Sequence, residues 1–150
     1  MPADPKRRSP LDIPPLYFAL AIASMVVMHR WLPMVDLIDR PWSYLGWMPI
    51  AGGIGLAIWA ERLFARADTG VRPFTPSTAP YRFTRNLMYM GMMLVLLGGF
   101  FLAGSLGSFL VIPIFFWWIH TNFVLPEEEH MVSHFGEAYL AYKQKTRRWI

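Results

Sequence analysis

The chain has 150 residues, of which 55% are hydrophobic and 16% are charged. Soluble proteins usually carry roughly 25% charged residues, so this balance indicates that lipid surrounds much of the surface. The absence of cysteine excludes disulfides, thiolate zinc sites, iron–sulfur clusters and cysteine nucleophiles. The basic residues flank apolar runs and form no continuous stripe. The net charge of +4 therefore indicates membrane-orienting charges, and we predict no nucleic acid partner.

The first half of the chain predicts a short tail and two membrane-spanning helices. Residues 1–15 combine a basic cluster with several prolines, which predicts a cytoplasmic tail. Residues 16–35 predict the first span. A signal peptide is the alternative interpretation of this run, but no small-residue cleavage site follows it. Residues 43–62 predict the second span.

Small residues in the second predicted span indicate how it packs. Ala51 and Gly55 are four residues apart, and so are Gly53 and Ala57. Residues at this spacing share one face of a helix, where their small side chains let another helix approach closely. We expect a packing role for both pairs.

The second half of the chain predicts a helical hairpin. After a polar loop that ends at Arg85, residues 87–126 contain only one potentially charged residue, His120. One unbroken helix of this length would measure ~60 Å, twice the hydrocarbon core of a bilayer. The glycines and serines of residues 104–108 are the expected place of reversal. We therefore predict spans at residues 88–104 and 107–126, and a cytoplasmic amphipathic helix over residues 127–146.

The predicted fold class is an all-α polytopic membrane protein of about four transmembrane helices, with a hairpin of the third and fourth. Residues 16–150 form its single domain. The basic tail, central loop and C-terminal segment all face one side when the chain crosses four times, so both termini are expected in the cytoplasm. A bacterial inner membrane is the expected location, and membrane lipid is the expected partner. The sequence carries no indication of an oligomeric state.

Three polar clusters converge on the cytoplasmic end of the predicted bundle. They are the loop from Arg66 to Tyr89, the base of the fourth span at His120, and the carboxylates of residues 127–129. An ionisable group near the interior of a membrane bundle is a functional candidate. Two structural alternatives stay open. His120 can be a satisfied interfacial histidine, and the carboxylates can be a solvated first helical turn.

Three segments then follow one another in a recognisable order. Residues 80–91 read Pro-Tyr-Arg-Phe-Thr-Arg-Asn-Leu-Met-Tyr-Met-Gly, Glu127 and Glu128 follow, and residues 135–142 read Phe-Gly-Glu-Ala-Tyr-Leu-Ala-Tyr. In this order and at this spacing, they resemble the isoprenylcysteine carboxyl methyltransferase and phospholipid methyltransferase superfamily. The resemblance covers roughly residues 66–150, while the first two predicted spans match only in being apolar.

The resemblance implies an S-adenosylmethionine site between the loop before the third span and the segment after the fourth. The cofactor contacts that it implies are Tyr81, Asn86, Leu87, Met88, Tyr89 and Glu127. Aromatic faces and a carboxylate suit the cationic groups of this cofactor. Tyr139 and Tyr142 are expected to close the site, and Arg85 or Arg82 to meet the cofactor carboxylate. We predict Arg85, His120 and Glu128 as the catalytic residues, and the resemblance implies no metal.

Departures from the family pattern bear on the substrate. Leu87 stands where the family has a proline, which is expected to loosen the backbone turn. The segment of residues 73–80 is shorter than usual. Phe123 stands where the prenylcysteine enzymes place an arginine that holds the substrate carboxylate, which argues against a prenylcysteine acceptor. The expected acceptor is a lipid-like or small hydrophobic molecule that enters from the bilayer.

Two other functions stay open. The chain can be a non-catalytic membrane protein that retains the methyltransferase fold, for which Leu87 and the short loop are the evidence. It can also be an NADPH-dependent membrane reductase, a class that shares a related C-terminal architecture. No Gly-x-Gly-x-x-Gly loop supports the reductase.

Overall fold

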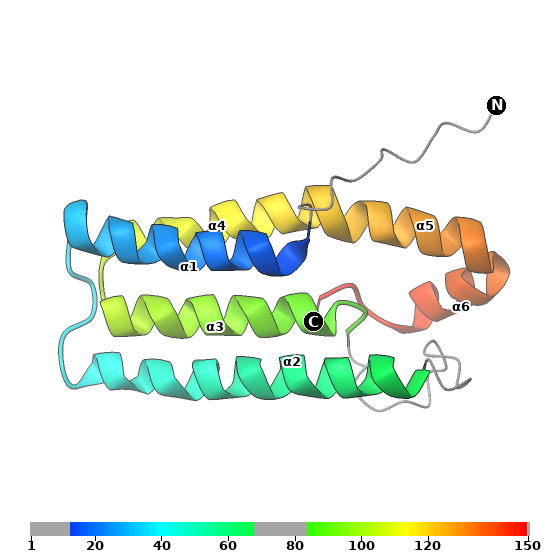
Figure 1. The fold of residues 1–150 in the computed structure, drawn as a ribbon, viewed down its shortest axis with the longest axis horizontal. Helices are drawn as coiled ribbons and strands as arrows, with labels where there is room; N and C mark the ends of the chain where they lie inside the picture. The colour runs from blue at the N-terminus through cyan, green and yellow to red at the C-terminus, as the bar shows by residue number, and fades with distance from the viewer. Residues whose placement is uncertain (1–12, 68–83, 150) are drawn as a thin grey trace.

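The computed structural model describes residues 13–67 and 84–149, and within these ranges the regular structure is helical, as predicted. Figure 1 shows the long helices side by side, with α1 next to α4 and α3 next to α2. The helices are α1 (Pro14–Trp31), α2 (Trp47–Ala67), α3 (Leu87–Ala103), α4 (Leu106–Ile119), α5 (Leu125–Phe135) and α6 (Glu137–Lys145). A 3-10 helix at Trp42–Gly46 precedes α2, and a π helix at His120–Val124 joins α4 to α5.

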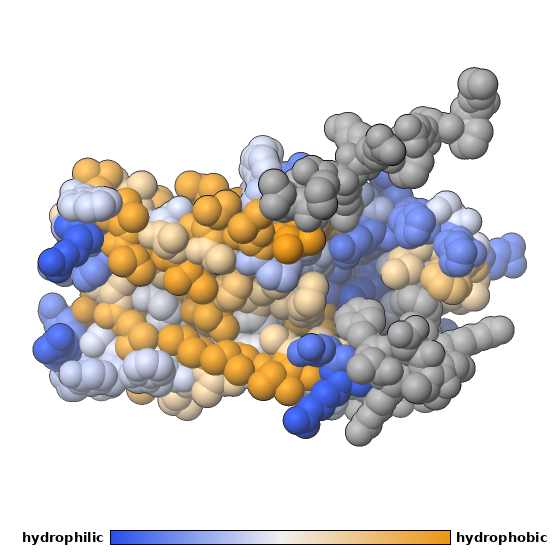
Figure 2. Space-filling model, in the orientation of Figure 1, coloured by the Kyte–Doolittle hydropathy of each residue, from blue (hydrophilic) through white to orange (hydrophobic). Residues whose placement is uncertain are grey.

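Apolar side chains cover the sides of this bundle. In Figure 2 they form a broad zone along the helices, and polar residues gather at the two ends. On the sides, Val26, Ile114 and Trp117 are each more than 60% exposed. Among the described residues, the continuous helix Leu106–Phe135 is long and apolar enough to cross a membrane, and α3 is apolar but shorter. An exposed apolar surface of this extent indicates contact with lipid.

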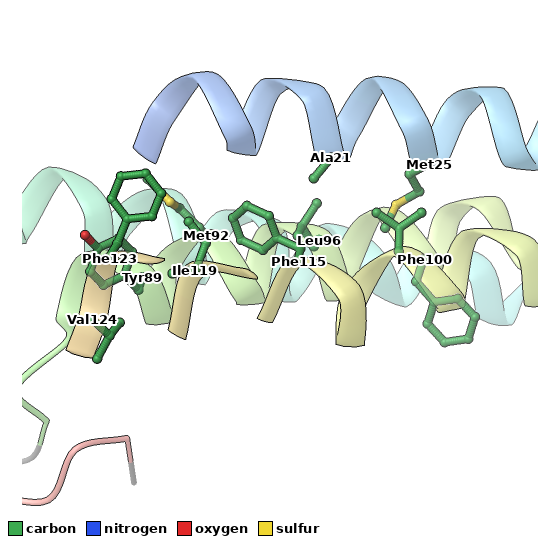
Figure 3. Packing of buried hydrophobic residues seen from close by; sticks show 11 residues of the cluster. Ala21, Met25, Tyr89, Met92, Leu96, Phe100, Phe115, Ile119, Phe123 and Val124 are labelled. Carbon is green, nitrogen blue, oxygen red and sulfur yellow. The ribbon is translucent and has the colours of Figure 1, made fainter. Parts of the chain in front are cut away.

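The core lies between α1, α3 and α4. Figure 3 shows Ala21 and Met25 of α1 pointing toward the side chains that α3 and α4 contribute. The buried members of this cluster are Ala21, Met25, Tyr89, Met92, Leu96, Phe100, Val111, Phe115, Ile119, Phe123 and Val124. Tyr89 and Phe123 lie at the end of the cluster where α3 begins and the π helix passes, so the core continues up to the candidate site.

Glycines set the distance of α3 from α2 and from the 3-10 helix before it, to which Gly46 belongs. Gly46 faces Gly98 and Gly53 faces Gly91, so that two glycines seven residues apart on one side meet two glycines seven residues apart on the other. A Cβ atom on any of the four would collide with the backbone carbonyl oxygen of the facing glycine. The two backbones therefore touch directly, which only glycine permits at this distance.

The structure confirms one of the two predicted small-residue pairs. A Cβ atom on Gly91 would also contact Ala57, so Gly53 and Ala57 both face α3. The other pair was assigned wrongly, because Ala51 is exposed and a Cβ atom on Gly55 would meet nothing within 4 Å. A four-residue spacing identifies a shared face but not which face a neighbour covers.

The first two helices differ in their bounds from the predicted spans of residues 16–35 and 43–62. α1 ends at Trp31, because Pro33 follows and the residue before a proline is disfavoured in a helix. α2 starts at Trp47, after the 3-10 helix, and continues to Ala67 into the segment expected to be a polar loop. Charged residues on an exposed helical turn need no break in the helix.

The chain reverses between α3 and α4 at Gly104, within the predicted segment of residues 104–108. Gly104 has a φ of 69°, the left-handed conformation that ends many helices. The connection that follows α1 lies against this turn. Leu37 donates its N–H to the Gly104 carbonyl oxygen at 2.6 Å, and Leu106 donates to that of Val35 at 2.9 Å. These bonds close the end of the bundle opposite the candidate site.

The predicted boundary at Pro126 between the fourth span and a helix over residues 127–146 is not observed. The helix runs on through Pro126, and the break comes at Gly136, whose φ is 54°. The N–H of Leu125 bonds to the carbonyl oxygen of His120, five residues back, which is the bond of a π helix. This wider turn ends just before Pro126. Proline has no N–H to donate and its ring crowds the preceding turn of a regular helix, so the widened turn accommodates it. The C-terminal helix is therefore two helices, α5 and α6.

The glycine contact gives a direct test. We expect Gly53→Ala to lower the free energy of unfolding by roughly 1–3 kcal/mol, because its methyl group meets the Gly91 backbone. The matched control is Gly52→Ala, whose Cβ atom meets nothing within 4 Å. It should be neutral or stabilising by roughly 0.5–1 kcal/mol through helix propensity. Thermal unfolding in detergent, followed by circular dichroism, measures both, and equal effects would contradict this packing.

Candidate functional site

Three segments far apart in the sequence meet at the end of the bundle where α3 begins. They are Thr84–Asn86 before α3, the first turn of α5, and residues 146–149 after α6. Figure 1 shows α5 and α6 beyond this end, with the C-terminus returning to the start of α3. The break at Gly136 folds α6 back toward α5 and thereby directs the chain to that place.

Glu128 is the centre of this assembly. It is only 5% exposed. Arg148 approaches it with two nitrogen atoms, Nε 2.9 Å from Oε1 and Nη2 2.9 Å from Oε2. Arg85 Nη1 lies 3.2 Å from Oε1, and Lys143 Nζ lies 3.3 Å from Oε2. One buried carboxylate thus holds three cations, one preceding α3, one on α6 and one in the C-terminal segment.

These contacts decide the charge state of the carboxyl group. Burial by itself raises the pKa of Glu128, but the hydrogen bond from Arg148, the charge of Arg85 and the bond from Lys143 outweigh it. The pKa of Glu128 is therefore below its ordinary value, and the group is ionised at neutral pH. Burial, and then the negative charge of Glu128, raises the pKa of the neighbouring Tyr139.

Hydrogen bonds to backbone carbonyl oxygens connect the C-terminal segment to the residues before α3. The N–H of Arg85 donates to the carbonyl oxygen of Arg147 at 3.1 Å. The Arg148 carbonyl oxygen accepts from Thr84 Oγ1 at 3.1 Å and from Asn86 Nδ2 at 3.0 Å. Thr84 Oγ1 in turn accepts from the N–H of Asn86 at 3.2 Å. The turn that lacks the family's proline is thus held by bonds to the end of the chain.

Leu87 has a packing role beside this turn. It is the first residue of α3 and is buried with Ala60, Tyr139 and Tyr142. The two tyrosine rings are 5.9 Å apart and come from α6. Met88 borders both this cluster and the main core. Three of the predicted cofactor residues therefore form a packed apolar wall, with Met88 at its edge.

A hydrogen bond joins two other predicted cofactor residues. The hydroxyl group of Tyr89 donates to Glu127 Oε1 at 2.8 Å, which links α3 to α5. Tyr89 is buried and Glu127 is half-buried, whereas the last carboxylate of the triplet, Glu129, is exposed. The three adjacent glutamates therefore occupy three different environments, and the solvated-turn alternative holds only for Glu129.

His120 lies at the first position of the π helix. Its ring stacks on Phe116, with the centroids 5.9 Å apart and the planes 3° apart. The ring of Trp149 is 6.0 Å away on the C-terminal segment. His120 Nδ1 is buried and has no hydrogen-bond partner among the described residues. Both alternatives for His120, a site residue and an interfacial histidine, therefore stay open.

A pocket of about 310 Å³ opens between α5, α6 and the C-terminal segment. Of the predicted site residues that the structure describes, Glu128 alone lines it. Its walls are Leu125, Glu128, Glu129, Val132, Ser133, Lys143 and Arg148. The pocket and the Tyr89–Glu127 pair therefore present different residues, and Glu128 with two of its cations, Lys143 and Arg148, belongs to the pocket.

The structure brings most of the predicted site residues to one end of the bundle. The exception is Tyr81, which with Arg82 lies outside the described residues. Thr84, Lys143 and Arg148 were missed as site residues. The basic C-terminal residues indicate membrane orientation in the sequence, and nothing in their spacing signals that they pair with a buried glutamate.

The chain is similar to known proteins. A family model described as phospholipid methyltransferase matches residues 42–138, more than half of the chain. An uncharacterized protein of Haemophilus influenzae is 36% identical over 63 residues, which are 42% of this chain and the whole of that protein. No solved structure matches the chain.

The lowered pKa of Glu128 predicts that the fold is less stable in acid. The ionised Glu128 contributes fully to the free energy of unfolding above the ordinary glutamate pKa of 4.5. This contribution is lost as the pH falls through the lower pKa that Glu128 has in the folded state. At neutral pH, Glu128→Gln should lower the free energy of unfolding by roughly 3–5 kcal/mol, because the buried Arg85 loses its counterion. In acid, where Glu128 of the wild type is protonated and uncharged, the variant and the wild type should have similar free energies of unfolding.

The exposed neighbour offers a matched control, because Glu129→Gln removes the same charge from the same helical turn. It should leave the unfolding temperature nearly unchanged at every pH. Thermal unfolding in detergent over a pH series measures all three proteins. A Glu128→Gln variant with the wild-type acid dependence would show that the ion pairs do not stabilise the fold.

Proposed function

Because the chain belongs to the phospholipid methyltransferase family, we propose that it is an S-adenosylmethionine-dependent methyltransferase of the membrane. Its acceptor is a lipid-like or small hydrophobic molecule. The observation that carries the proposal is the contact of Tyr89 with Glu127 at 2.8 Å, beside the ion pairs of Glu128. Residues 38 positions apart in the sequence meet there, and both are positions at which the family resemblance implies cofactor contacts.

The proposal includes four membrane crossings. α1 has 18 residues, α2 has 21 and α3 has 17, and the helix from Leu106 to Phe135 has 30. At 1.5 Å per residue the shortest measures ~26 Å, close to the ~30 Å of a hydrocarbon core. The longest extends beyond the core and carries its last turns, with Glu127 and Glu128, out of the hydrocarbon.

The orientation follows from the distribution of charge. Basic residues gather at the site end, where α6 and the C-terminal segment carry Lys143, Lys145, Arg147 and Arg148. Loops rich in lysine and arginine stay in the cytoplasm. We therefore place this end and both termini in the cytoplasm, and the protein in a bacterial inner membrane.

The chemistry of the described side chains suits the proposed cofactor. S-adenosylmethionine supplies a methyl group on a sulfonium cation, and it also carries an ammonium, a carboxylate and an adenosine. Arg85 Nε is buried without a hydrogen-bond partner among the described residues, and a carboxylate is the ligand that a guanidinium fits best. Glu127 and the ring of Tyr89 suit a cation. Leu87, Met88, Tyr139 and Tyr142 offer the apolar wall beside which adenosine can pack.

We assign Glu128 a positioning role in place of the catalytic role that the sequence suggested. Both of its oxygen atoms are engaged by cations, so it has no free acceptor for a substrate proton. It holds Arg85 near the start of α3 and fixes the C-terminal segment. Methyl transfer depends mainly on alignment of the two reactants in a site from which water is excluded, so positioning residues contribute to the rate.

Phe123 supports an acceptor other than a prenylcysteine. Where the prenylcysteine enzymes place an arginine, its ring is 3% exposed and belongs to the apolar core. No positive charge is therefore available at that position for a substrate carboxylate. The exposed apolar surface of α4 suits an acceptor that arrives from the bilayer.

Isothermal titration in detergent tests the cofactor. S-adenosylmethionine and its demethylated product should both bind saturably, and NADPH should not. Glu127→Gln should weaken the binding of S-adenosylmethionine by roughly 10–100-fold, because a charge-assisted contact contributes about 1.5–3 kcal/mol. Glu129→Gln is the control and should bind as the wild type does.

The outcomes separate the three candidate functions. Folded protein that binds neither S-adenosylmethionine nor its product would refute the methyltransferase, and binding of NADPH alone would favour the reductase. Cofactor binding without transfer of a radiolabelled methyl group to any fraction of a lipid extract would favour a non-catalytic protein. Saturable binding together with transfer is the result that we expect.

A further inference from the structure

Two exposed cations flank Thr146 and lie outside the ion pairs of Glu128. They are Lys145, the last residue of α6, and Arg147. Thr146 between them is buried and has an extended backbone, with φ −123° and ψ 130°. Neighbouring side chains point to opposite sides of an extended backbone, so Lys145 and Arg147 both point away from the protein. The two positive charges therefore face the same surroundings.

Two contacts place this part of the chain at the boundary between lipid and water. The N–H of Arg85 donates to the carbonyl oxygen of Arg147 at 3.1 Å, and the uncharged helix α3 begins two residues later, at Leu87. The ring of Trp149 packs on Phe116, with the centroids 5.0 Å apart. Phe116 is 37% exposed on the apolar side of α4. Tryptophan beside basic residues is typical of the membrane interface.

An anionic lipid head group is the ligand that fits two cations at this level. Its phosphate oxygens accept hydrogen bonds from an ammonium and a guanidinium, and basic residues beside a membrane span attract anionic lipids. Glu137 is the only acidic residue of α6 and lies in its first turn, at the other end of the helix from Lys145. The positive charge at Lys145 and Arg147 is therefore not cancelled within this helix.

We propose that Lys145 and Arg147 bind the head group of an anionic lipid, which serves as a structural ligand and not as a methyl acceptor. Arg148, the next residue, binds Glu128 through two nitrogen atoms, and Trp149 beyond it packs on the core. The lipid and Trp149 thus hold the chain on both sides of Arg148. Lipid binding therefore favours the conformation in which Arg148 pairs with Glu128. This inference requires the membrane location and does not depend on methyl transfer.

Thermal unfolding in a neutral detergent at low salt tests the binding. Phosphatidylglycerol added to the micelles should raise the unfolding temperature of the wild type more than phosphatidylcholine with the same acyl chains, because a ligand of the folded state stabilises it. Sodium chloride should reduce this difference by screening the charges. Glycerol phosphate in the water should not reproduce it, which separates a lipid head group from a free phosphate. Equal unfolding temperatures in the two lipids would overturn the proposal.

Two charge-matched double variants locate the effect. Lys145→Gln/Arg147→Gln should weaken the binding of phosphatidylglycerol by roughly 10–30-fold, since each basic residue near an anionic surface contributes about fivefold. Arg30→Gln/Arg40→Gln is the control, because both arginines are exposed at the opposite end of the bundle. It should respond to phosphatidylglycerol as the wild type does. An equal loss in both double variants would show a general effect of net charge and refute the assigned site.

Hydrogen exchange tests the link to the ion pairs, because the N–H of Arg85 is bonded to the segment that the lipid is proposed to hold. Exchange is measured by mass spectrometry on the peptide that contains Arg85. Nanodiscs of phosphatidylglycerol should slow it by roughly fivefold or more relative to phosphatidylcholine, the contribution of at least one basic residue. Lys145→Gln/Arg147→Gln should exchange at the same rate in both lipids. A wild-type rate that is independent of the lipid would contradict the proposed link.

Neither experiment uses S-adenosylmethionine, so this inference and the proposed function can fail separately. A protein that binds no cofactor but responds to phosphatidylglycerol at Lys145 and Arg147 would refute the methyltransferase alone. Cofactor binding without any preference for the anionic lipid would refute the lipid site alone. Should the double variant fail to fold, the lipid and salt dependence of the wild type still decides.

Discussion

A carboxylate removed from water is the constraint on which this end of the molecule depends. Glu128 is stable in its buried position only if its cations stay in contact, because a buried charge without a partner is strongly unfavourable. The cations belong to three segments, at residues 85, 143 and 148, so their contacts fix the start of α3, helix α6 and the chain end together. The glycine contacts between α2 and α3 hold the bundle beneath them by close packing alone.

Arg148 links the segments that meet at the site end of the bundle. Its side chain binds Glu128, its carbonyl oxygen holds Thr84 and Asn86, and the next residue, Trp149, contacts His120. Glu128, the turn before α3 and His120 are therefore all contacted by one short C-terminal segment. In the proposed methyl transfer, which depends mainly on alignment, this segment would hold the proposed cofactor contacts in place.

Local patterns predicted the hairpin of α3 and α4, because a long apolar run offers few places to reverse and Gly104 suits the left-handed turn. They failed at Pro126, since a π helix depends on how the whole turn is packed and has no simple sequence pattern. The described motif residues lie at one end of the bundle, and Tyr81 lies outside the described residues. The partners of Glu128 could not be predicted, because pairing between segments so far apart is decided by the fold and not by spacing along the chain.

A double-mutant cycle between Glu128 and Arg148 tests the central claim most directly. The free energy of unfolding is measured in detergent for the wild type, Glu128→Leu, Arg148→Met and the double variant. If the ion pair organises the site, the double variant should be little worse than the poorer single variant, with a coupling energy of roughly 1 kcal/mol or more. Effects that simply add would show that the two residues act independently and would contradict the account.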